Sequence, residues 1–209
     1  MATTMETRTP FVREASHALL PPDSSAHTVR MWGSDTLLFR RIDACEHDRR
    51  RRTGAARLDR IAHLETLMAL PAGVPVPLRS LDSRLRNAVR ALPDGAVELD
   101  GRCVTRLAVR PMCLELAVVR AGGWRSGLEA AGRFAPVCRR AMLLEREPPG
   151  LEPLLAEAAY YGIGVLLPRA DRLEMAAWPA AFRPARHTAA AWLFVEEIYQ
   201  LIERAATGS

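Results

Sequence analysis

Apolar residues recur at three- and four-residue spacing in the first half of the chain, which predicts two amphipathic helices. The first runs from 56 to 70, and its apolar stripe consists of Leu58, Ile61, Leu64 and Met68. The second begins at its N-cap, Ser80, and continues to Leu92, with leucine and valine on one side and arginine on the other. Proline-containing segments at 71–77 and 93–95 end the two helices.

The period of the pattern changes after residue 95. Apolar runs at 96–99, 102–109 and 113–120 are separated by turn signals, which predicts three consecutive antiparallel strands. Helices and strands then alternate, with helices at 126–139 and 151–161, strands at 141–145, 163–167 and 172–177, and a last helix at 187–206. This order predicts an α/β fold with a mixed central sheet, built from the three-strand antiparallel meander plus crossover strands and flanked by helices.

Two segments with different organisation are predicted. Residues 1–55 contain several prolines, serines and threonines, and we expect a loosely structured N-terminal extension with an arginine-rich loop. Residues 56–209 are expected to form a single α/β domain with its core at 96–180. No run approaches the ~18 apolar residues of a spanning helix, and the N-terminus lacks the apolar segment of a secretory signal. We therefore expect a cytoplasmic protein that does not contact a membrane.

Lysine is absent, so all 29 residues counted as Lys plus Arg are arginine. This usage is typical of a GC-rich genome of the kind found in actinobacteria, and it excludes a Schiff-base or Walker-A lysine. The net charge of +5 favours an anionic partner. The densest charge predicts a solvated loop, with a nucleic-acid patch as the alternative, and consists of Arg49, Arg50, Arg51 and Arg52. Cys45-Glu46-His47 has metal-ligand residue types without a companion pair and is expected in the same loop.

Three segments carry a family resemblance in the second half of the chain: VELDGRCVTRLAVRPMCLELAVVRA, GLEAAGRFAPVCRRAMLLERE and LLAEAAYYGIGVLLP. With these segments, residues 96–180 resemble the restriction-endonuclease-like, or PD-(D/E)XK, superfamily in architecture. The resemblance implies a carboxylate on the second strand and a Glu-x-Lys on the third, which bind divalent metal in active members of the family.

The chain departs from this family at the chemical positions. Glu115 stands where the third-strand acid is expected, and Ala117 stands where the lysine is expected. The position of the second-strand carboxylate falls near Arg106. Asp100 and Glu98 can supply that carboxylate only in a different strand register. Two of the three chemical positions are therefore absent, and we assign no metal and no cofactor.

Glu115 lies in an almost wholly apolar strand, where an unpaired carboxylate is costly. Arg106 on the neighbouring strand is the expected partner, together with Arg120. One interpretation is a buried structural ion pair. The other makes Glu115 a general base beside an anion pocket, in which a phosphate or sulfate is held by Arg102, Arg106 and Arg120.

Three functional hypotheses follow from these residues. The first is a non-nucleolytic relative of the endonuclease fold that binds nucleic acid or an assembly partner through arginine-rich surfaces. No helix-turn-helix pattern is visible, so base-specific reading of DNA is not expected. The second is a small-molecule enzyme of actinobacterial specialised metabolism that acts on a phosphorylated or sulfated metabolite by proton abstraction or elimination. The third is a residual metal nuclease that uses Asp100 and Glu115 without lysine.

Overall fold

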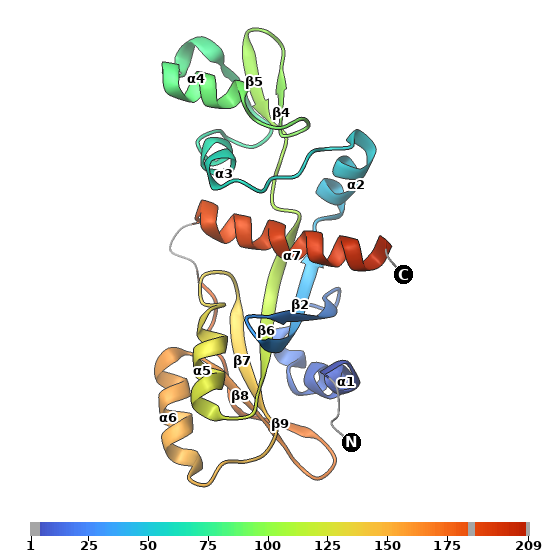
Figure 1. The fold of residues 1–209 in the computed structure, drawn as a ribbon, viewed down its shortest axis with the longest axis vertical. Coiled ribbons are helices and arrows are strands. Elements are labelled where there is room, and N and C mark those ends of the chain that lie inside the picture. Colours follow the sequence, from blue (N-terminus) through green and yellow to red (C-terminus); the bar gives the residue numbers. More distant parts are fainter. Residues whose placement is uncertain (1–4, 184–186, 208–209) are drawn as a thin grey trace. The chain divides into compact units, whose positions relative to one another are not determined.

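The computed structural model describes residues 5–183 and 187–207, and its ribbon is drawn in Figure 1. The chain divides into two compact units. Unit 1 consists of Met1–Arg41 and Leu114–Pro184, and unit 2 consists of Ile42–Cys113 and Ala185–Ser209. Most of unit 2 is thus an insertion within the sequence of unit 1, which differs from the predicted boundary at residues 55 and 56.

A six-stranded mixed sheet forms the centre of unit 1. In spatial order its strands are β1 (Ser25–Met31), β2 (Ser34–Ile42), β6 (Met112–Ala121), β7 (Arg139–Leu144), β8 (Gly164–Pro168) and β9 (Leu173–Ala177). The outer pairs β1–β2 and β8–β9 are antiparallel, and β6, β7 and β8 are parallel. Arg41 of β2 contacts Glu115 near the start of β6. Asp35, near the start of β2, contacts Arg120 near the end of β6, so these two strands run in opposite directions.

Helices cover both faces of this sheet. The helices of unit 1 are α1 (Met5–Ala15), α5 (Trp124–Gly132) and α6 (Leu151–Tyr161), with a 3₁₀ turn η1 (His17–Leu19). Val12 of α1 lies in one buried cluster with Leu143 of β7. A Cβ on Gly127 of α5 would lie 2.7 Å from the sulfur of Met142, whose side chain points to the other face because it alternates with Leu143. The predicted α/β class, with a mixed sheet flanked by helices, is confirmed.

The N-terminal segment contributes regular structure to this unit. β1 and β2 supply two of the six strands, and Phe39 of β2 is fully buried in the core. The expectation that residues 1–55 are loosely structured is therefore wrong for the described residues. The apolar run of β2 is short, and polar residues flank it on both sides, so the sequence pattern there is weak.

The predicted meander at 96–120 does not form. β4 (Val97–Leu99) and β5 (Cys103–Arg106) pair as expected, but their sheet lies in unit 2 and is completed by β3 (Pro75–Pro77) in the order β3-β5-β4. β6, the third predicted strand, instead pairs with β7 in unit 1. Arg110-Pro111 directly precedes β6, so this turn signal does separate two strands, but it does not specify which strand β6 pairs with.

Unit 2 contains helices α2 (Ala44–Thr53), α3 (Ile61–Met68), α4 (Ser83–Arg90) and α7 (Ala189–Thr207), and a 3₁₀ turn η2 (Leu78–Ser80). Leu64 of α3 and Trp192 of α7 share one buried cluster, whereas Val89 of α4 and Val104 of β5 share another. Asp43 caps α2 by accepting the backbone N–H of Glu46, so the predicted arginine-rich loop is a helix. Within the described ranges, no helix has the length and apolar content that a membrane span requires.

Candidate functional site

The residues predicted to form one site lie in two units. Glu115 and Arg120 belong to unit 1, whereas Glu98, Asp100, Arg102 and Arg106 belong to unit 2. Glu115 Oε1 accepts a hydrogen bond from Arg41 Nε at 2.9 Å, and its side chain is 15% exposed. The partner of Glu115 thus comes from β2 rather than from the strand that carries Arg106, because β5 and β6 are not neighbours.

Arg106, the predicted partner of Glu115, has a structural role instead. Its guanidinium donates to the backbone carbonyls of Leu67, Leu70 and Ala108. It also lies over the indole ring of Trp192, 4.8 Å from the ring centroid. Burial lowers the pKa of Arg106 below its ordinary value, and the charge of Arg110 adds to this effect. These contacts use Nε and Nη1 of the guanidinium, so Arg106 holds the end of α3 in place.

Asp100 and its neighbours form the tip of the β4–β5 hairpin. Asp100 Oδ1 accepts the backbone N–H groups of Cys103 at 2.6 Å and Arg102 at 2.9 Å. These two hydrogen bonds lower the pKa of Asp100, with the bond from Cys103 as the larger cause. Glu98 is exposed on β4. The carboxylate of Asp100 is therefore used to close the turn.

Arg120 has two acidic neighbours in unit 1. Its Nη2 lies 2.7 Å from Glu145 Oε1, and its Nη1 lies 3.8 Å from Asp35 Oδ2. Together with Arg30 and Ser126 these residues line a polar pocket of about 360 Å³. Sequence reasoning missed Asp35 and Glu145, although Asp35 directly precedes the buried run of β2 and Glu145 directly follows β7.

The arginine block lies in α2 and divides into two pairs. Arg49 and Arg50 both donate to the buried carboxylate of Glu46, with nitrogen–oxygen distances of 2.6 to 2.8 Å. Arg50 also donates through Nη1 and Nη2 to the two oxygens of Glu196, at 2.7 and 2.8 Å. Burial opposes the charge on Arg50, but the hydrogen bond to Glu196 and the other carboxylate contacts raise its pKa above the ordinary value. Only Arg51 and Arg52 are exposed.

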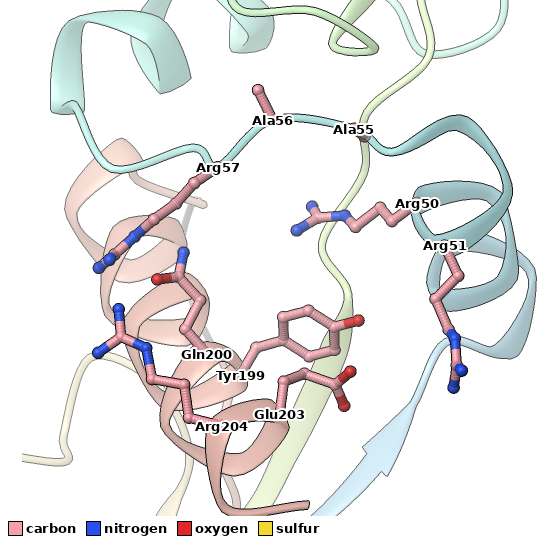
Figure 2. A pocket seen from close by; sticks show the side chains of 9 residues that line it. All are labelled: Arg50, Arg51, Ala55, Ala56, Arg57, Tyr199, Gln200, Glu203 and Arg204. Atoms are coloured by element: carbon pink, nitrogen blue, oxygen red, sulfur yellow. The ribbon is translucent and has the colours of Figure 1, made fainter. Parts of the chain in front are cut away.

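A pocket of about 340 Å³ opens between the α2 end and α7 within unit 2 (Figure 2). It is lined by Arg50, Arg51, Ala55, Ala56, Arg57, Tyr199, Gln200, Glu203 and Arg204. Figure 2 shows the guanidinium groups of Arg57 and Arg204 on the same side of the pocket as the amide of Gln200. The Oε1 atom of Gln200 is buried and has no hydrogen-bond partner in the described parts of the chain. The lining thus combines four arginines with the carboxylate of Glu203.

Tyr199 forms the wall of this pocket. Its hydroxyl lies 2.7 Å from Nδ1 of His47, and its ring lies beneath the guanidinium of Arg50, 5.5 Å from it. Burial raises the pKa of Tyr199, and the nearby carboxylate of Glu203 raises it further. The phenol therefore stays neutral near pH 7 and holds a fixed orientation between α2 and α7.

Further exposed basic side chains of unit 2 lie on α4, on η2 and at the hairpin tip. Arg84, Asn87 and Arg90 are exposed on α4, whereas Leu85 and Val89 of the same helix pack inward. A groove of about 490 Å³ separates η2 from the hairpin tip, and the exposed side chains of Arg79 and Arg102 line it. We call the four exposed arginines of α4, η2 and the hairpin tip, with Asn87, the helix–hairpin surface.

Comparisons with known proteins give no further assignment: no protein-family model, no curated protein and no solved structure matches this chain. Among the described residues, no group of three or more His, Cys, Asp or Glu side chains is placed to hold a metal ion. The candidate sites of this protein are the two basic sites of unit 2 and the polar pocket of unit 1.

Proposed function

We propose that this protein binds nucleic acid through the helix–hairpin surface of unit 2 and does not cleave it. The observation that carries the proposal is the one-sided character of α4, where Arg84, Asn87 and Arg90 point outward from a helix fixed by the buried Val89. Arginines held on a packed helix contact phosphates at a small cost in side-chain and backbone ordering.

The acidic residues of this surface are engaged in local hydrogen bonds. Asp82 accepts the backbone N–H of Leu85 as the N-cap of α4, at 2.7 Å. Asp100 accepts two backbone N–H groups of the hairpin tip. Glu98 is also exposed on β4, but Arg79, Arg84, Arg90 and Arg102 outnumber these three acidic residues. The surface is thus net positive and suits a phosphate backbone.

The order of elements in unit 1 supports a distant relation to the restriction-endonuclease-like fold. The unit has a helix, three strands, a helix, a strand, a helix and two strands, with β1, β2 and β6 as the first three strands and β9 as a further strand after β8. In this register the second strand carries Asp35, and the third carries Val118 and Arg120 in the spacing of the Glu-x-Lys acid and lysine. An apolar side chain at the acid position and an arginine at the lysine position support binding without metal-dependent hydrolysis.

Fluorescence anisotropy with a short duplex DNA, in the absence of divalent metal, tests the proposal. If each of the four arginines contacts one phosphate, the logarithm of the association constant should fall against the logarithm of the salt concentration with a slope of about −3.6. The affinity should then decrease about a hundredfold between roughly 50 and 200 mM salt. Arg84→Gln is expected to weaken binding and to bring the slope to about −2.7. Arg146→Gln, which removes one exposed arginine of unit 1, is the matched control and is expected to change neither value.

Three outcomes would contradict the proposal. If Arg84→Gln and Arg146→Gln changed DNA affinity equally, the helix–hairpin surface would not be the DNA interface. The absence of binding to duplex and single-stranded DNA at low salt would favour a protein partner instead. Magnesium- or manganese-dependent cleavage that is lost in Asp35→Asn would show that the polar pocket of unit 1 is a nuclease site.

A further inference from the structure

Helix α4 belongs to a compact substructure of unit 2 that the sequence pattern does not reveal. In chain order this substructure consists of α3, β3, η2, α4 and the β4–β5 hairpin, and β3 pairs with β5. Only residues 81 and 82 separate η2 from α4. A helical turn, a short connection and an exposed helix form a shortened helix-turn-helix, a motif whose second helix enters the major groove of DNA. The sequence lacks the usual pattern because η2 has only three residues, which is too short for a hydrophobic period.

Hydrogen bonds and apolar packing hold these elements together. Arg86 of α4 donates through Nε to the carbonyl of Leu78 at 3.1 Å and through Nη2 to that of Leu81 at 2.9 Å. The backbone N–H of Leu78 donates to the carbonyl of Arg102 at 2.8 Å, which fixes the hairpin tip to η2. Val89 of α4 packs in one apolar cluster with side chains of β3, η2 and the hairpin, so α4 and the hairpin lie side by side (Figure 1). The orientation of α4 is therefore fixed, and little free energy is lost to ordering when this surface binds a ligand.

The exposed face of α4 has an uncharged side chain at its centre and an arginine at each edge. Successive residues of a helix are rotated by about 100°, so Asn87 lies about 60° from Arg84 on one side and about 60° from Arg90 on the other. A helix with its side chains is about 10–12 Å across, which matches the width of about 12 Å of the major groove of B-DNA. In that groove the edges of the face lie near the two phosphate strands, whereas its centre lies near the bases.

The composition of this surface favours duplex DNA over other nucleic acids. Single strands are bound by stacking on aromatic side chains, but residues 75–106 contain no Phe, Trp or Tyr. Duplex RNA has a major groove that side chains cannot read. The exposed carboxylate of Glu98 lies on the face of the small sheet that points away from α4, because its neighbour Val97 packs in the cluster of α4. Duplex DNA is therefore the ligand that fits α4.

We propose that α4 enters the major groove of duplex DNA and that Asn87 recognises an adenine there. The NH₂ group of an asparagine donates to N7 of adenine, and its oxygen accepts a hydrogen bond from the N6 amino group. Arg84 and Arg90 contact phosphates on the two sides of the groove, and Arg102 of the hairpin tip contacts a further phosphate. This inference rests on the proposed function, since it concerns the same surface, and it adds a preference for a base sequence.

Selection from a library of short duplexes with a randomised centre, followed by sequencing of the bound fraction, tests this inference. The wild type should enrich a sequence with an adenine at one position, and Asn87→Ala should lose that enrichment. In fluorescence anisotropy, a G·C pair at this position should weaken wild-type binding about fivefold or more, whereas Asn87→Ala should bind the two duplexes with equal affinity. The salt slope of Asn87→Ala should equal that of the wild type, because asparagine carries no charge. Alanine favours an exposed helix, so the variant should fold.

Thr53→Ala is the matched control, because it removes an exposed polar side chain of α2 that lies outside the helix–hairpin surface. It should keep the base preference of the wild type. Three results would overturn this inference although DNA is bound: no enriched sequence, an adenine preference that persists in Asn87→Ala, or equal affinity for duplex RNA of the same sequence. The absence of any binding to duplex DNA at low salt would overturn the proposed function as well, so the two failures are distinguishable.

Discussion

Removal of the charge on Glu196 tests the buried ion-pair network that joins α2 to α7 in unit 2. The Glu196 side chain has no exposed surface, and its Oε1 also accepts the indole N–H of Trp192 at 2.9 Å. Glu46 and Glu196 carry two negative charges, and Arg49 and Arg50 carry two positive charges, so the network is neutral as a whole. Glu196→Gln keeps the side-chain shape but leaves one positive charge in excess.

The magnitude of this effect follows from the geometry. With charge centres about 4 Å apart and an effective dielectric constant of about 20, the attraction between Arg50 and Glu196 is about 4 kcal/mol. This value agrees with the roughly 3–5 kcal/mol that is lost when one partner of a buried pair is removed. We expect Glu196→Gln to lower the free energy of unfolding of unit 2 by about 3 kcal/mol, since the glutamine oxygen still accepts one hydrogen bond. Glu197→Gln changes the exposed neighbour and should cost less than about 0.5 kcal/mol.

Hydrogen exchange followed by mass spectrometry resolves this loss along the chain. A loss of about 3 kcal/mol corresponds to a decrease of about a hundredfold in the protection of amides in α2 and α7. A second variant, Arg50→Met with Glu196→Leu, replaces both charges by apolar groups and should destabilise less than the sum of the single changes. Equal protection in Glu196→Gln and Glu197→Gln, or additive losses in the double variant, would refute the role of the network.

Two further predictions concern titratable groups of unit 1. Burial and the charge of Arg40 lower the pKa of His27 below 6.5, so the unfolded chain binds more protons at this residue than the folded chain does. The free energy of unfolding should therefore fall as the pH is lowered from 7 to 5. The difference between the urea midpoints at the two pH values should be smaller in His27→Gln than in the wild type, and an unchanged difference would contradict the assignment. Burial raises the pKa of Cys138 to about 12. Iodoacetamide at pH 8 should therefore modify the exposed Cys45 and Cys113, whereas Cys138 should react only after denaturation. Peptide mass spectrometry identifies the modified cysteines, and modification of Cys138 in the folded protein would contradict this prediction.

The periodic segments of the sequence predict elements well, because hydrophobic period depends on local packing. The apolar stripe predicts a helix at 56–70, which forms over the shorter range Ile61–Met68 as α3. The arginines and leucines after Ser80 predict α4, but its N-cap is Asp82 rather than Ser80. The alternating helices and strands from α5 to β8 are also predicted in the correct order. The partners of β5 and β6 are not, since an inserted unit changes strand pairing without changing the local pattern of either strand.

The same limit applies to the candidate sites. Glu115 was correctly expected to need a cationic partner, but the partner is Arg41 because β2 lies beside β6. The polar pocket around Arg120 depends on Asp35 and Glu145, which are separated by more than a hundred residues in the sequence. No spacing rule joins such residues. Only the pairing of β2, β6 and β7 brings them together.

The arginines also show why charge density along a sequence is a poor guide to a binding surface. Successive residues of an α-helix point about 100° apart, so four consecutive arginines cannot share one face. In α2 this rotation buries Arg49 and Arg50 against Glu46 and exposes Arg51 and Arg52. A helical surface that binds an anion instead needs residues three or four apart, as Arg84, Asn87 and Arg90 are on α4. The densest block of charge therefore stabilises unit 2, and dispersed arginines form its exposed basic surface.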